Sequence, residues 1–143
     1  MTPYQIAKSM LGLHEVKDNK KIKDFLKKYA IKGDIALDPA QYPWCAVIVN
    51  AWERAAGNPG NGRQNARSFL TYGDKVELKD AKQGDILIFA RGGSNWMGHV
   101  TYLDRVEKDA SGRVLLRCLG GNQSDSVSIG WYPKDRLLGI RRK

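Results

Sequence analysis

One apolar run predicts a buried helix near the middle of the chain. The run covers residues 45–56, and its apolar positions alternate too weakly for a β-strand. Pro43 stands just before it, and proline cannot be part of a helix interior, so the helix is expected to begin close to Cys45. Gly57 follows it, and glycine readily adopts the left-handed conformation that ends many helices. Cys45 should therefore lie in the first turn of a buried helix.

This position gives Cys45 two possible roles. The free backbone N–H groups and the positive end of the helix dipole favour a thiolate at a helix start. The same N–H groups can stabilise an oxyanion that forms when the sulfur attacks a carbonyl carbon. The alternative is that Cys45 is a small core residue, as most free cysteines are. The rest of the chain has to decide between a nucleophile and a structural cysteine.

Length and composition narrow the class of protein. The 143 residues are expected to form a single domain, 1–143, large enough to bury a core. Lysine and arginine number 24 against 15 acidic residues, a net charge of +9, which favours anionic partners. The basic residues form only short clusters, which are more typical of solvated faces than of binding stripes.

Several classes of site and location are not predicted. No apolar stretch of 18 residues is present, so no transmembrane segment is expected. The N-terminus lacks the apolar region of a signal peptide, which predicts synthesis in the cytoplasm, with release by other means if the protein acts outside the cell. His14 precedes Glu15 but has no second histidine four residues on, so neither a metal nor another cofactor is predicted. A disulfide between Cys45 and Cys118 stays open.

The remaining elements indicate an α+β fold, with N-terminal helices packed on a C-terminal antiparallel β-sheet. Thr2-Pro3 can start a first helix that ends at Gly12, and Asp18-Asn19 can cap a second. A loop at residues 33–42 precedes the cysteine and is a candidate wall of a cleft. From Asp74 onward the pattern is that of strands, expected at residues 86–89, 99–107, 114–122, 127–131 and 137–141.

Residues 109–112, Asp-Ala-Ser-Gly, predict a hairpin turn whose register decides what lies beside His99. In one register Asp104 faces Arg117, Tyr102 faces Leu119, Val106 faces Leu115, and His99 faces Asn122. A bulge at Gly112 would instead place Arg105 opposite Arg117, and His99 opposite Gln123. The charge pairs favour the first register. In both, an amide side chain lies beside the imidazole.

Cysteine, histidine and amide together form the set that thiol catalysis requires. The imidazole accepts the thiol proton, and a polar group on its other nitrogen fixes its tautomer and orientation. Alone, His99 could be a strand residue satisfied by a neighbour, and Asn122 a turn residue after two glycines. Their convergence with Cys45 favours a catalytic site.

Two stretches then carry a family resemblance. Residues 84–89, Gly-Asp-Ile-Leu-Ile-Phe, followed by Gly98-His99-Val100, resemble the CHAP family of cysteine amidases and peptidases, which belongs with the NlpC-type peptidases of the papain-like clan. Residues 43–46 and 119–123 resemble a small-protein branch of that clan common in bacteriophage genomes. The resemblance covers roughly residues 40–140.

The resemblance implies a papain-like fold and an endolysin-like hydrolase of bacterial peptidoglycan, which would lyse bacteria by cutting an amide bond in or next to the stem peptide. It implies Cys45 as nucleophile, His99 as general base and acid, and Asn122 as the orienting residue. Many members carry a glutamate where this chain has Gly120, which leaves Asn122 as the sole third member. The residues expected to contact substrate flank these motifs: Tyr42, Trp44, Trp96 and Gln123.

Two other functions remain open at this stage. The chain could be a basic module that binds nucleic acid or another anionic polymer, with Cys45 structural, although aromatic and basic residues are not interleaved on one strand. It could also be an acyl or amide transferase on the same fold, because an amine can intercept a thioester. The favoured expectation is a monomeric hydrolase that binds peptidoglycan and no nucleic acid.

Overall fold

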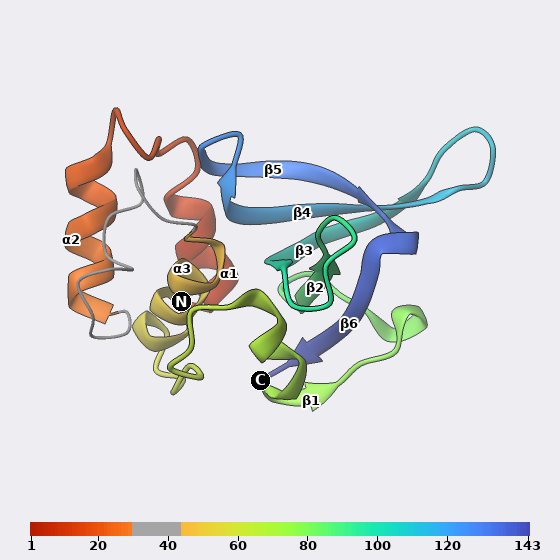
Figure 1. The fold of residues 1–143 in the computed structure, drawn as a ribbon, viewed down its shortest axis with the longest axis horizontal. Helices are drawn as coiled ribbons and strands as arrows, with labels where there is room; N and C mark the ends of the chain where they lie inside the picture. Colours follow the sequence, from red (N-terminus) through yellow and green to blue (C-terminus); the bar gives the residue numbers. More distant parts are fainter. Residues whose placement is uncertain (30–43) are drawn as a thin grey trace.

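The computed structural model describes residues 1–29 and 44–143 and has the predicted α+β architecture (Figure 1). Three helices come first in the chain and a six-stranded antiparallel sheet follows. The helices are α1 (Pro3–Ser9), α2 (Asn19–Tyr29) and α3 (Cys45–Ala55). The strands are β1 (Asp74–Lys75), β2 (Ile86–Ala90), β3 (Gly98–Lys108), β4 (Val114–Gln123), β5 (Ser126–Pro133) and β6 (Leu137–Arg142). Short 3-10 helices are η2 (Ala66–Thr71), η3 (Leu78–Asp80) and η4 (Lys134–Arg136).

The helix ends follow the signals in the sequence. Thr2 caps α1 through a reciprocal pair of hydrogen bonds with Gln5, and a proline occupies the first turn. Helix α3 begins at Cys45, as predicted. It ends before Gly57, whose φ is +94°, and the backbone N–H of Asn58 returns to the carbonyl of Glu53. That pair of features is a Schellman motif, which confirms the predicted glycine stop.

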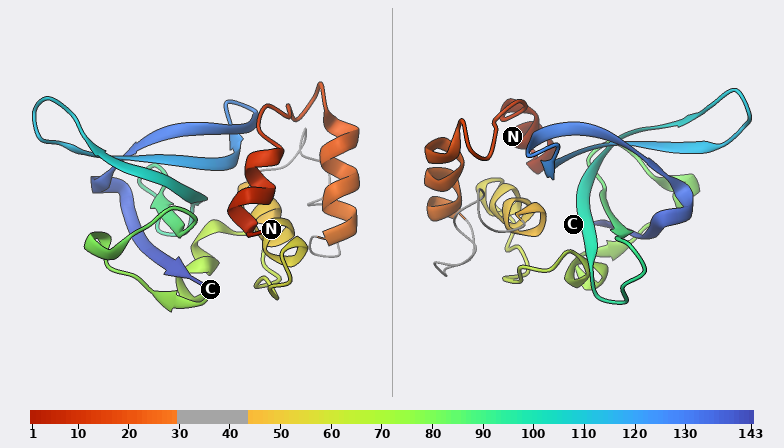
Figure 2. Two further views of the ribbon diagram at one scale, coloured as in Figure 1. Left: turned by 180° about the vertical axis from the view of Figure 1, so that it is seen from behind. Right: turned by 45° about the horizontal axis from the view of Figure 1, so that its top comes forward.

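The sheet has the strand order β1-β6-β2-β3-β4-β5, so β1 and β5 are its edge strands. The sheet curves strongly between them (Figures 1 and 2). Successive residues of β2 point to opposite faces. Ile86 and Ile88 pack into the core shared with the helices, whereas Leu87 and Phe89 pack into a second core on the other face. This explains why β2 reads as a continuous apolar run, since both of its faces are buried.

The β3–β4 hairpin combines both predicted registers. Tyr102 pairs with Leu119 as expected from the first, but Arg105 pairs with Arg117 as in the second. The shift lies between Leu103 and Arg105, so the bulge is at Asp104 and not at Gly112, and the expected pairing of Val106 with Leu115 is wrong. Asp104 and Arg117 are not backbone partners, yet their side chains form an ion pair of 2.7 Å. The predicted charge pair therefore forms through the side chains, while the predicted first register holds only up to Leu103.

Two contacts fix α3 on the sheet. At its beginning, Trp44 and Ile48 pack directly on Gly121 of β4, where a β-carbon would lie 2.7 Å from either side chain. Nearer its end, the buried Glu53 accepts hydrogen bonds from the hydroxyl groups of Tyr72 and Tyr102, at 2.9 and 2.6 Å. Asn58 Nδ2 donates a third hydrogen bond to Glu53, at 3.1 Å. A buried carboxylate is tolerated because its oxygens are satisfied in this way.

The predicted loop at residues 33–42, including Tyr42, lies outside the described residues. Among the residues that the structure does describe, no helix is both long and apolar enough to cross a bilayer.

The contact at Gly121 predicts a large effect for one added methyl group. Gly121→Ala should lower the free energy of unfolding by about 1–3 kcal/mol, because its β-carbon would overlap Trp44 and Ile48. Gly93→Ala is the matched control, since no heavy atom lies within 4 Å of the added carbon. Urea denaturation of both variants measures the difference. Equal stability of the two would mean that α3 does not lie this close to β4.

Candidate active site

Cys45 is the first residue of α3 and lies at the junction of the helix and the sheet. Trp44 is the N-cap residue and provides no side-chain hydrogen bond to the helix start. The backbone amides of Cys45, Ala46 and Val100 lie against the sulfur. The thiol is 5% exposed and borders a cavity of about 180 Å³ that is also lined by Trp96. The structure therefore places a thiol and several N–H donors at one edge of a cavity.

The charge state of Cys45 differs from the sequence-based expectation. Burial raises the pKa of the Cys45 thiol, while the amide of Val100 and the charge of Arg91 lower it by less. The helix start was expected to favour a thiolate, but the loss of hydration outweighs it. Burial thus favours the neutral form of the Cys45 thiol.

His99 is held by an amide whose orientation is fixed. Its Nε2 lies 2.9 Å from Oε1 of Gln123. The side-chain nitrogen of Gln123 donates to the carbonyl of Ser128 at 2.6 Å, and the hydroxyl of Tyr132 donates to Gln123 Oε1 at 2.7 Å. Because the amide oxygen is an acceptor, the Nε2 of His99 must carry the hydrogen. The neutral imidazole is therefore held as a single tautomer.

That tautomer leaves Nδ1 of His99 as a free base. Nδ1 is buried and has no hydrogen-bond partner within the described part of the chain. Burial lowers the pKa of His99 to about 4, against the opposing effect of the Gln123 hydrogen bond. The backbone amide of the next residue, Val100, lies against the Cys45 sulfur, so the part of β3 that carries the imidazole runs beside the thiol. An unpartnered, unprotonated Nδ1 here can accept the thiol proton.

Gln123 takes the position that Asn122 was expected to hold. Strand β4 is irregular between Gly120 and Gln123, where Asn122 has a left-handed φ of +58°, and the turn that follows has φ of +50° at Ser124 and +59° at Asp125. This turn directs the side chain of Gln123 to the imidazole. No hydrogen bond joins His99 to Asn122 in the described ranges. Gln123, expected to contact substrate, is instead buried behind the histidine.

The predicted aromatic contacts differ in placement. Trp44 is fully buried and its indole donates to Glu15 at 3.0 Å, so the expectation that it lines the cleft is wrong. Trp96 is 72% exposed and borders the Cys45 cavity, where a substrate could touch it. Tyr42 lies outside the described residues.

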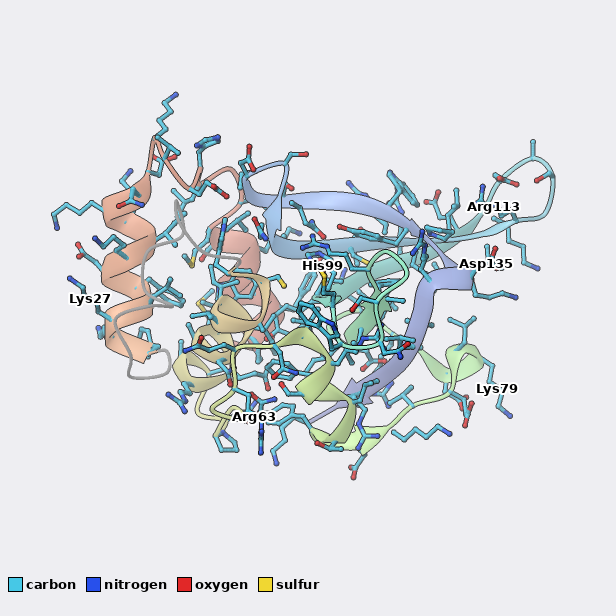
Figure 3. All side chains as sticks on the ribbon, viewed as in Figure 1. Lys27, Arg63, Lys79, His99, Arg113 and Asp135 are labelled. Atoms are coloured by element: carbon cyan, nitrogen blue, oxygen red, sulfur yellow. The ribbon has the colours of Figure 1, made fainter. Side chains whose placement is uncertain are left out.

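Two residues that the sequence did not single out belong to the site. The ring of Tyr132 lies 5.4 Å from that of His99, and its hydroxyl holds Gln123. Arg91, directly after β2, lines the Cys45 cavity and also a second cavity of about 270 Å³ beside His99. Nothing in the sequence marked Tyr132, whereas Arg91 stands at the end of a buried strand near the predicted histidine. Figure 3 shows His99, on β3, near the middle of the molecule.

The other candidate features are structural. Cys45 and Cys118 are both free, so the disulfide left open by the sequence is not formed, and Cys118 is fully buried on β4. Nδ1 of His14 accepts from the backbone of Val16 at 3.1 Å, which stabilises a local turn. Within residues 1–29 and 44–143, no group of three His, Cys, Asp or Glu residues is placed to hold a metal ion.

Comparison with known proteins identifies a family. The family model described as CHAP domain matches residues 37–118, a span that includes both Cys45 and His99 and ends before Asn122 and Gln123. A search of curated proteins finds no match.

The low pKa of His99 predicts a pH-dependent stability. Below pH 6.5 the unfolded chain binds a proton at His99, while the folded protein does not until about pH 4. The free energy of unfolding should therefore fall between pH 6.5 and 4, by up to about 3 kcal/mol from this group. Chemical denaturation across this range, wild type against His99→Gln, isolates the contribution. A difference that does not vary with pH would mean that the imidazole is not desolvated.

Proposed function

Because the chain belongs to the CHAP domain family, we propose that it cleaves an amide bond of bacterial peptidoglycan through a thioester on Cys45. CHAP domains are in general peptidoglycan hydrolases and amidases. The observation that carries the cysteine mechanism is the buried, unpartnered Nδ1 of His99, held in the site of a thiol at a helix start. A structural histidine of this burial would have a partner on both nitrogens.

In the proposed reaction the proton of the Cys45 thiol moves to Nδ1 of His99 as the sulfur attacks the amide carbonyl. The oxyanion accepts hydrogen bonds from backbone N–H groups at the start of α3, with that of Cys45 the nearest to the reacting carbon. Nδ1 then donates its proton to the leaving amine, and the C–N bond breaks to leave a thioester.

Water completes the cycle. Nδ1 of His99 accepts a proton from a water molecule that attacks the thioester carbonyl, and the C–S bond breaks. The products are a carboxylic acid and the regenerated thiol. The raised pKa of Cys45 and the lowered pKa of His99 describe the protein before substrate is attacked. In this proposal the thiolate–imidazolium pair of Cys45 and His99 forms only as the sulfur attacks.

Gln123 is the orienting residue in this proposal. Its amide oxygen accepts from the Nε2 hydrogen of His99 and becomes a better partner as positive charge develops on the ring. Tyr132 and Ser128 hold that amide from the other side, so the amide of Gln123 cannot reorient without breaking three hydrogen bonds. These two residues position Gln123 and do not touch the reacting atoms.

The proposed biological role is that of an endolysin, as the resemblance to the bacteriophage branch suggests, acting as a monomer at the cell wall. The net charge of +9 suits adhesion to an anionic envelope. Which amide bond is cut is decided by analysis of the products, as in the first experiment below.

Removal of the nucleophile tests the proposal directly. Wild type should clear a suspension of purified peptidoglycan, whereas Cys45→Ala should lose essentially all turnover, because no thioester can form. Cys118→Ala is the matched control and should retain activity if it folds, because the Cys118 side chain packs in the second core and does not line the Cys45 cavity. Mass spectrometry of the released fragments identifies the bond. Equal clearing by wild type and Cys45→Ala would make the cysteine structural, and inactivity of a folded wild type would favour polymer binding.

A second pair of variants distinguishes Gln123 from Asn122 as the orienting residue. Gln123→Met keeps the size of the side chain but removes the hydrogen bond, and should lower kcat about 10- to 100-fold with KM little changed. Asn122→Gly keeps the left-handed backbone and should lower kcat by less than a factor of about 3. Steady-state kinetics on soluble peptidoglycan fragments measure both. The reverse order of effects would return the role to Asn122.

A further inference from the structure

Arg91 occupies the point where the two cavities of the site meet. It follows the last residue of β2, Ala90, and its side chain is exposed. One cavity that it lines contains Cys45, and the other contains His99 and Tyr132. A substrate that occupies the Cys45 cavity therefore lies against a surface to which Arg91 contributes.

The walls of both cavities are cationic and contain no acidic side chain among the described residues. Arg136 stands beside Arg91 in the second cavity, and its Nη1 donates to the carbonyl of Gly92 at 3.3 Å. Arg91 itself forms no hydrogen bond or ion pair with any part of the chain that the structure describes. The two arginines thus give the entrance to the site a local positive charge, and the guanidinium of Arg91 has free donors.

A free guanidinium beside a peptide-cleaving centre favours an anionic group, and on a peptide substrate that group is a carboxylate. Its planar set of donors binds a carboxylate through two parallel hydrogen bonds, and does so more strongly in a partly desolvated cavity than in water. An amide or a sugar hydroxyl would leave its charge unpaired. The ligand that fits Arg91 is therefore a carboxylate on the peptide substrate itself.

We propose that Arg91 is the specificity residue of this site and binds a free carboxylate of the substrate next to the amide bond that is cut. The inference rests on the proposed hydrolysis of peptidoglycan and goes beyond it, because it selects among amide bonds. Bonds flanked by a free carboxylate are cleaved, and bonds flanked by an amidated or neutral group are disfavoured. The bound carboxylate also holds the substrate so that its carbonyl faces Cys45.

The test is a cycle between the residue and the substrate group. Peptidoglycan stripped of phosphate-containing polymers is used untreated, or after its carboxylates have been converted to primary amides with carbodiimide and ammonium ion. Initial rates are measured for wild type, Arg91→Gln and Arg113→Gln on both materials. Arg113 is exposed at the far end of the β3–β4 hairpin, away from His99, and controls for general charge attraction to the polymer (Figure 3).

Amidation should lower the rate of wild type and of Arg113→Gln about tenfold or more, the size expected for one lost charge-assisted pair. Arg91→Gln should be slower by a similar factor on untreated material and nearly insensitive to amidation. If Arg91→Gln is slower than wild type by the same factor on untreated and on amidated material, the proposal is overturned. Arg91 would then act on the thiol or on the fold and not on a substrate carboxylate.

The same experiment separates this inference from the proposed function. If wild type cleaves neither material, the hydrolase proposal fails, and the inference fails with it. If wild type cleaves both at equal rates, the hydrolase proposal stands and the carboxylate preference is wrong. Arg91→Lys adds a further check, since a single ammonium group should restore only part of the discrimination that the planar guanidinium provides.

Discussion

The position of the nucleophile depends on a buried carboxylate two turns further along the same helix. Glu53 lies about 12 Å from Cys45 along α3, at 1.5 Å per residue, and is bound by Tyr72 and Tyr102. Tyr102 belongs to β3, the strand that carries His99. The hydrogen bonds of Glu53 therefore fix the position of α3 along its own axis relative to the sheet. Gly121 sets how closely the first turn of α3 approaches β4. Because Cys45 is on α3 and His99 is on β3, the distance from thiol to imidazole is set by a helix and a strand and not by loops.

Burial and hydrogen bonding have separate effects on the catalytic pair: burial sets the charge of both groups, and a hydrogen bond sets the tautomer of His99. Desolvation keeps Cys45 and His99 both neutral at rest, against the helix dipole that would favour a thiolate. The acceptor oxygen of Gln123 then decides which imidazole nitrogen is protonated, which directs the free lone pair of Nδ1 away from the amide. Neither effect alone would make a base available. Burial without Gln123 would leave the tautomer unfixed, and Gln123 without burial would allow the imidazole to be charged before the substrate arrives.

The sequence predicted those parts of the fold that have strong local punctuation. Gly57 ends α3 as expected, because a proline before the run and a glycine after it leave little choice, and the strands follow apolar runs between turns. The sequence did not predict the bulge at Asp104, since an ion pair to Arg117 can form from either register. It assigned the orienting role to Asn122 because consecutive left-handed residues after β4 cannot be recognised from residue types alone.

A thiol that stays protonated and almost fully covered is also chemically durable. Peroxides and disulfides react with the thiolate form of cysteine. The reaction becomes slower when a smaller fraction of the cysteine is ionised and when the sulfur is less exposed. The raised pKa of Cys45 and its 5% exposure therefore slow oxidation to sulfenic acid in the absence of substrate. Cys118, the other cysteine, is more completely enclosed and cannot serve as a resolving partner. The site thus holds a nucleophile that resists oxidation until a substrate binds.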